Sequence, residues 1–167
     1  IMETRVTDTA AFVRATIHEL LHQPYDVNSA EFWAALDTLR TDPFVAQHFE
    51  THDVNRGYND WQGYVGESCT DVAEQFISEE LGIARPVRTR FGADEDGGMH
   101  VLAPALYVLA RSEGFPQNGE TLQAFVIRMV DEQKLAPGKL ESLKEDFQAL
   151  QKLSNGFGFP LIEQEKT

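Results

Sequence analysis

The stretch His18-Glu19-Leu20-Leu21-His22 has the residue types and spacing that could bind a metal and use it in catalysis. Positions i and i+4 of an α-helix lie on the same face, so His18 and His22 could direct two imidazoles at a single ion. In such an H-E-x-x-H motif the two neutral imidazoles bind Zn²⁺. The adjacent carboxylate, here Glu19, takes a proton from water that the metal activates. The alternative interpretation is an amphipathic helix with two exposed histidines.

A catalytic zinc ion takes a third protein ligand and leaves its fourth position for water. Glu67 is our candidate for that ligand. Asp71 follows four residues later on the same helical face, where it could accept a hydrogen bond from a zinc-bound histidine and fix the orientation of its ring. An E-x-x-x-D segment after an H-E-x-x-H helix is what a site built from two helices requires. The sequence therefore predicts a zinc site.

The elements that must position these residues are predicted to be helices. The first is expected to be capped by Thr7 or Thr9 and to end before Pro24, so the two histidines occupy its last turns. A long helix from about residue 64 to residue 81 carries the E-x-x-x-D segment and is closed by Gly82. Loops are expected at residues 53–63 and 83–99, and further helices after the caps Asn28 and Asp42 and over residues 103–113, 119–134 and 138–153.

The length of 167 residues and the hydrophobic content of 42% suit one domain with a real core. We expect residues 1–167 to form a single catalytic domain, which could be part of a longer precursor. Residues 2–6 are the one candidate strand, so the expected fold class is mainly α, or α+β with minimal strand. The single cysteine, Cys69, excludes an internal disulfide, and its place beside the apolar face of the long helix favours a core role.

The charge of the chain excludes some classes of partner. Fourteen basic and 27 acidic residues give a formal net charge of −13, whereas nucleic acids and anionic membranes require cationic patches. No apolar run approaches the length of a membrane span, and no signal-like segment opens the chain. We therefore expect neither nucleic acid nor a membrane as a partner.

Three blocks of the sequence resemble the thermolysin-like zinc metallopeptidases, a branch of the gluzincins. After the H-E-x-x-H block, the segment from Tyr58 to Asp71 (YNDWQGYVGESCTD) is similar to the family's third-ligand segment. The segment from Asp96 to His100 (DGGMH) is similar to the family's Asn-Gly-Gly-Val-His segment, and residues 105–109 resemble its continuation. Three blocks in this order are much more specific than any one of them.

The resemblance implies an endopeptidase that acts on a peptide or protein substrate. The family is largely secreted, but nothing in this sequence indicates export, so both a secreted and a cytoplasmic location remain open. The resemblance also implies zinc ligation by His18, His22 and Glu67, general-base catalysis by Glu19, hydrogen bonds from Tyr58 and His100 to the developing oxyanion, and support of a ligand by Asp71. The family also uses an arginine, between the third ligand and the catalytic histidine, that binds the substrate carbonyl. Of Arg85, Arg88 and Arg90 in that interval, we favour Arg85.

The chain also departs from the family. The interval between His22 and Glu67 is longer than in thermolysin itself, and residues 25–50 look like an inserted helical pair. Few residues precede His18, where the family has a β-rich lobe that supplies the edge strand along which substrate lies. The chain is thus expected to correspond to the helical lobe of a longer protein or to a minimal version with an incomplete groove.

Alternatives remain for the metal site and for the function of the whole chain. A second i, i+4 histidine pair, His48 and His52 with Glu50 between them, could bind metal but lacks a following E-x-x-x-D. For the whole chain, the second hypothesis is an inactive or weakly active domain of the same fold that binds a peptide or partner protein. The third is a helical interaction or immunity-type protein, in which the acidity faces a basic partner and the H-E-x-x-H motif is accidental.

Overall fold

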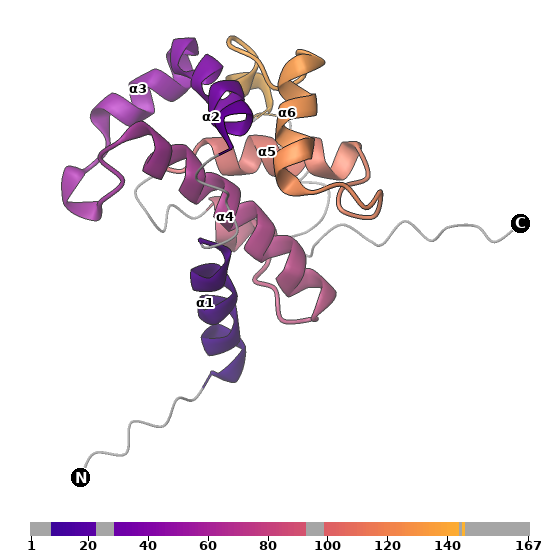
Figure 1. Cartoon of the computed structure of the whole chain (residues 1–167). Coiled ribbons are helices and arrows are strands. Elements are labelled where there is room, and N and C mark those ends of the chain that lie inside the picture. Colours follow the sequence, from indigo (N-terminus) through magenta and orange to yellow (C-terminus); the bar gives the residue numbers. More distant parts are fainter. Residues whose placement is uncertain (1–7, 23–28, 93–98, 144, 146–167) are drawn as a thin grey trace, which may run out of the picture.

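The computed structural model describes residues 8–22, 29–92, 99–143 and 145, and the regular structure within these residues is helical (Figure 1). This confirms the mainly α fold class. The candidate strand at residues 2–6, and residues 146–153 of the last predicted helix, lie outside the described residues. The helices are α1 (Thr9–Leu21), α2 (Ala30–Asp37), α3 (Pro43–Thr51), α4 (Trp61–Glu80), α5 (Leu102–Ser112) and α6 (Leu122–Asp131), with short turns η1 (Thr38–Thr41), η2 (Val54–Arg56) and η3 (Arg88–Gly92) between them.

Side-chain caps determine where the first helices begin. Asp8 caps α1, because its Oδ1 accepts a hydrogen bond from the Ala11 amide at 2.9 Å, so the expected threonine cap was wrong. Asp42 caps α3 as expected. Ser29 caps α2, one residue after the predicted Asn28, which lies outside the described residues.

The long helix α4 begins one turn earlier than the sequence pattern indicated. Asp60 caps it by accepting a hydrogen bond from the Gly63 amide at 2.8 Å, so the loop predicted for residues 53–63 is shorter. The helix ends where expected, and Gly82 has a φ of 68°, in the left-handed region that favours glycine. Because of the earlier start, Tyr64 lies about one turn into α4, on the same side as Glu67.

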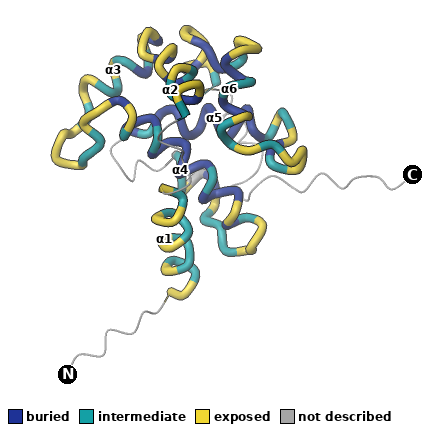
Figure 2. The backbone as a smooth tube through the Cα atoms, in the orientation of Figure 1, coloured by how far each residue is buried: buried dark blue, intermediate teal, exposed yellow. Residues whose placement is uncertain are grey.

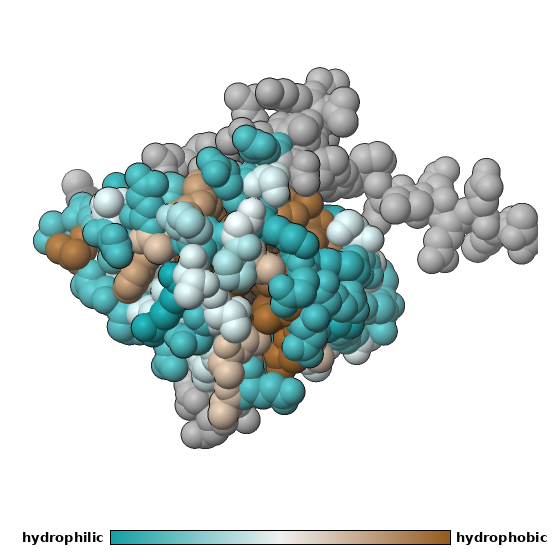
Figure 3. Space-filling view, turned by 90° about the horizontal axis from the view of Figure 1, so that it is seen from above, coloured by the Kyte–Doolittle hydropathy of each residue, from teal (hydrophilic) through white to brown (hydrophobic). Residues whose placement is uncertain are grey.

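Helices α4 and α5 form the centre of the molecule (Figure 2). Residues 102–110 of α5 are all buried, and α2 packs against α6 on the other side of the core. Cys69 is fully buried on α4, and this burial raises the pKa of its thiol to about 12, which agrees with a core role. The face of the molecule that Figure 3 shows is mostly hydrophilic, with hydrophobic residues gathered near its middle.

Helix α1 differs from the others, because none of its residues is buried. It packs against α4 and lies at the edge of the molecule, where Phe12 and Leu20 are 62% and 63% exposed (Figure 1). Arg14 donates a hydrogen bond from Nη1 to the Ile83 carbonyl at 2.7 Å, which ties α1 to the segment after α4. The H-E-x-x-H motif therefore lies on a helix whose main neighbour is the helix that carries Glu67.

Candidate metal centre

The packing of α1 against α4 brings the three predicted zinc ligands together. His18 Nε2 lies 3.0 Å from Glu67 Oε1, and His22 Nε2 lies 3.4 Å from Glu67 Oε2. The two histidine Nε2 atoms are 3.3 Å apart, as expected for side chains four residues apart on one helical face. Four potential donor atoms from two helices thus converge on one point.

These distances fit a tetrahedral zinc ion. Zinc binds histidine nitrogen at about 2.0–2.1 Å and carboxylate oxygen at about 2.0–2.2 Å, so two of its ligand atoms at the tetrahedral angle lie about 3.3–3.5 Å apart. The separations given above for the atoms of His18, His22 and Glu67 are close to this value. In addition, the buried Oε2 atom of Glu67 has no hydrogen-bond partner, although buried carboxylate oxygens are normally satisfied. The residues present therefore fit a metal ion.

The electrostatics of the three side chains also suit a cation. Burial alone would raise the pKa of the Glu67 carboxyl, but the hydrogen bond from His18 and the charge of the imidazoles outweigh burial and hold that pKa below its ordinary value of 4.5. The same hydrogen bond raises the pKa of His18 above 6.5, against the effect of burial. Without metal, a proton on His18 compensates the carboxylate, and a divalent cation could replace it.

Asp71 lies on the opposite side of the His18 ring. Its Oδ1 is 3.6 Å from His18 Nδ1, while His18 Nε2 faces Glu67. The carboxylate of Asp71 is buried and accepts a hydrogen bond from the Nη2 atom of Arg90. Asp71 is therefore placed to orient His18, the position that the sequence analysis predicted for it.

His100 and Tyr58 lie together beside this cluster. Their rings are 5.4 Å apart in an edge-to-face arrangement, and Tyr58, which follows Gly57, has a left-handed φ of 57°. His100 also lies with Glu67 and Asp71 in a second group of possible metal ligands within 4.8 Å of one another. Because the Arg90 guanidinium already pairs with Asp71, a second cation is less favourable here than at the first group.

Glu19 is exposed, next to His18 on the outer face of α1. A general base must come within hydrogen-bond reach of the proton that it accepts. Glu19 follows His18 directly in the chain and is open to solvent, which is compatible with that task.

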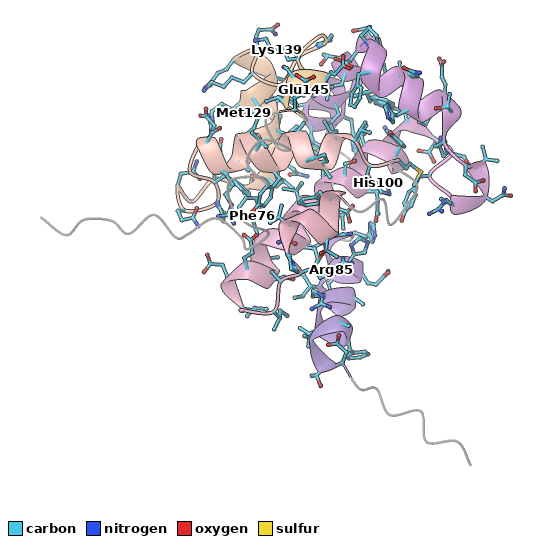
Figure 4. The ribbon with its side chains drawn as sticks, turned by 180° about the vertical axis from the view of Figure 1, so that it is seen from behind. Phe76, Arg85, His100, Met129, Lys139 and Glu145 are labelled. Carbon is cyan, nitrogen blue, oxygen red and sulfur yellow. The ribbon has the colours of Figure 1, made fainter. Side chains whose placement is uncertain are left out.

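The arginines after α4 lie close to acidic side chains of that helix. Arg85 Nη2 lies 3.8 Å from Glu74, and the residue lies near α1 in Figure 4. Arg90, in the π-helical turn η3, contacts both Asp71 and Glu74. The sequence analysis named Arg90 as one of three choices but did not favour it. The turn that directs Arg90 at α4 has no local sequence signal that could have distinguished it.

The second histidine pair does not form a comparable group. His48 Nδ1 lies 2.8 Å from the Phe44 carbonyl and His52 Nδ1 lies 2.5 Å from the Phe49 carbonyl, so each ring bonds to its own helix. Among the described residues, the groups that could hold a metal include neither histidine. The segment from Asp96 to Gly98, which contributed to the resemblance, lies outside the part of the chain that is described.

Within the described ranges, no helix is long and apolar enough to cross a membrane. Comparisons with protein-family models, with curated proteins and with solved structures found no match for the chain.

Proposed function

We propose that the chain is a zinc-dependent endopeptidase that hydrolyses peptide bonds. The observation that carries this proposal is the convergence of His18, His22 and Glu67, from two separate helices, at the mutual distances of a tetrahedral zinc site. Three protein ligands leave one coordination position for water or substrate, which distinguishes a catalytic from a structural site. The order of the three sequence blocks supports peptide hydrolysis over other reactions of bound zinc.

The metal, when bound, supplies Lewis acidity that makes water a better nucleophile and polarises the substrate carbonyl. Glu19, the exposed carboxylate beside His18, accepts the proton of the attacking water and passes it to the leaving amine nitrogen. Asp71 keeps the His18 ring in the orientation that directs Nε2 toward Glu67. These are the roles that the resemblance implies for the three residues.

His100 and Tyr58 are the proposed donors to the carbonyl oxygen as it becomes negative. Their rings are 5.4 Å apart, and the His100 imidazole lies close to the Glu67 carboxylate. Donors that are already oriented stabilise developing charge without reorganisation. Arg90 pairs with Asp71 and adds positive charge to the same region.

The test is hydrolysis of a mixture of internally quenched peptides by the zinc-loaded protein and by Glu19→Gln. We expect cleavage by the parent and a rate at least about 10²–10⁴-fold lower for the variant, because general-base catalysis contributes about this much. Zinc content should be unchanged in Glu19→Gln, since Glu19 is not a ligand. Glu50→Gln, which alters the central residue of the other histidine pair, is the matched control and should cleave like the parent.

Two outcomes would contradict the proposal. If the zinc-loaded parent cleaves no peptide but binds peptides from the same mixture, the alternative of an inactive peptide-binding domain is correct. If Glu19→Gln cleaves as fast as the parent, the H-E-x-x-H carboxylate has no catalytic role.

A further inference from the structure

Helix α4 carries a line of buried polar side chains that extends beyond the metal centre. The line consists of Glu67, Asp71, Glu74 and Ser78, at spacings of four, three and four residues, and each is at most 6% exposed. These spacings keep the four side chains on one face of the helix. Glu67 and Asp71 contact the histidines of α1, but the zinc site and its proposed reaction do not account for Glu74.

Glu74 is held by polar groups on both of its oxygens. Ser78 Oγ donates a hydrogen bond to Oε1 at 2.7 Å, and Arg90 Nε lies 3.2 Å from Oε2. Arg90 also donates from Nη2 to Asp71, so one guanidinium spans the two carboxylates. Its side chain is 7% exposed, so water screens these interactions only weakly.

The geometry makes Arg90 and His18 compete for Asp71, because both face the Oδ1 atom of its carboxylate. If the guanidinium paired with Asp71 alone, it would neutralise the carboxylate and weaken the interaction of Asp71 with the His18 imidazole. Because the Arg90 guanidinium also interacts with Glu74, it neutralises Asp71 only in part. Asp71 therefore retains negative charge that can attract His18. The same arrangement keeps the Arg90 cation from moving closer to the point where the metal ligands converge.

We propose that Glu74 is a positioning residue of the metal centre: it holds Arg90 between two carboxylates, so that Asp71 can orient His18 and support zinc binding. This inference rests on the proposed function. It assigns to Glu74, which touches neither the three ligands nor the reacting atoms, an effect on metal affinity that passes through Arg90 and Asp71.

A purely structural ion pair is the competing explanation, and α4 offers a matched example. Glu79 pairs with Arg111 and accepts a hydrogen bond from the Tyr107 hydroxyl at 2.9 Å. Glu79 lies on the same helix as Glu74, and its pair with Arg111 links that helix to α5. No described contact connects Glu79 to Asp71 or His18, so Glu79→Gln should affect folding stability alone.

The experiment measures zinc affinity by competition with a chromophoric chelator for the parent, Glu74→Gln, Glu79→Gln and the double variant Glu74→Gln/Arg90→Gln. We expect Glu74→Gln to weaken zinc binding about tenfold, the lower end of the range for supporting residues. Glu79→Gln should match the parent. The double variant should recover the parent's zinc affinity, because without Arg90 the Asp71 carboxylate interacts with His18 alone. A structural role for Glu74 would not produce this recovery.

The absorption spectrum of the cobalt-substituted protein gives a second readout, because it reports ligand geometry directly. We expect a changed spectrum for Glu74→Gln and a parent-like one for the double variant. Circular dichroism checks folding. If Glu74→Gln does not fold, the test is the double variant, in which the buried arginine is also removed. Zinc binding as tight as in the parent would support the role of Glu74, and weaker binding would contradict it.

Equal affinities of Glu74→Gln and Glu79→Gln, or a double variant as weak as Glu74→Gln, would overturn the role of Glu74. In that case a parent that binds zinc leaves the proposed function intact. A parent that binds no zinc overturns both proposals.

Discussion

Two histidine pairs with the same spacing have different surroundings in this molecule. His18 and His22 end α1, and His48 and His52 end α3. The first pair directs both Nε2 atoms at Glu67 of α4, whereas the Nδ1 atoms of the second pair lie at carbonyls of their own helix. The second pair also packs against aromatic rings, with Phe44 4.5 Å from His48 and Phe49 5.6 Å from His52.

The difference shows that spacing within one helix is not enough for a metal site. An i, i+4 pair supplies two ligands, and the third must come from an element that packs across them. Helix α4 supplies a buried carboxylate to the first pair. Near the second pair, His52 Nε2 instead lies 3.2 Å from the Asn59 side-chain oxygen, which is a neutral group.

The largest effect is expected when the α4 carboxylate is removed. Glu67→Ala should leave His18 and His22 as an isolated pair and weaken zinc binding by more than about 100-fold, the upper end of the range for residues that only support a ligand. Glu50→Ala, which removes the carboxylate between the other two histidines, should leave zinc affinity unchanged. Isothermal titration with zinc measures both. Equal affinities for the two variants would show that the pairs do not differ as described.

The two proposed oxyanion donors extend the comparison of the histidine pairs to catalytic activity, because they lie beside the first pair. We expect Tyr58→Phe and His100→Gln each to lower kcat by about 10²–10³ with little change in KM, as for the loss of one oxyanion donor. Their zinc content should equal that of the parent. A rise in KM alone would assign these residues to ground-state binding of substrate instead.

A smaller effect is expected from pH in the metal-free protein. The raised pKa of His18 means that its contribution to stability is complete below the ordinary value of 6.5 and is lost as pH rises through the raised pKa. The lowered pKa of Glu67 means that its contribution is present above 4.5 and is lost as pH falls through the lowered pKa. The midpoint of thermal unfolding should therefore decline as pH rises above about 6.5.

The control for this prediction is the second histidine pair, His48 and His52. His18→Gln should remove the decline above pH 6.5, whereas His48→Gln should retain it. Zinc affinity should change in the opposite direction and increase with pH, because the proton on His18 must leave before the metal binds. A midpoint that does not depend on His18 would contradict the described ion pair with Glu67.

Much of this arrangement could be predicted from local patterns. Helix periodicity located α4, and the i, i+4 and E-x-x-x-D spacings identified side chains that share a face. The caps Asp8 and Asp60 were missed because several polar residues precede each helix, and only the bond to a backbone amide selects one of them. The pairing of Arg90 with Asp71 depends on the path of the chain after α4, which no local spacing encodes.

The most direct test of the account is the zinc content of the dialysed protein, measured by elemental analysis beside His22→Ala and His52→Ala. The account predicts about one zinc per chain in the parent and in His52→Ala, and none in His22→Ala, because removal of a ligand opens the site. A parent that holds no zinc after reconstitution would contradict it. So would a His22→Ala variant that keeps its zinc.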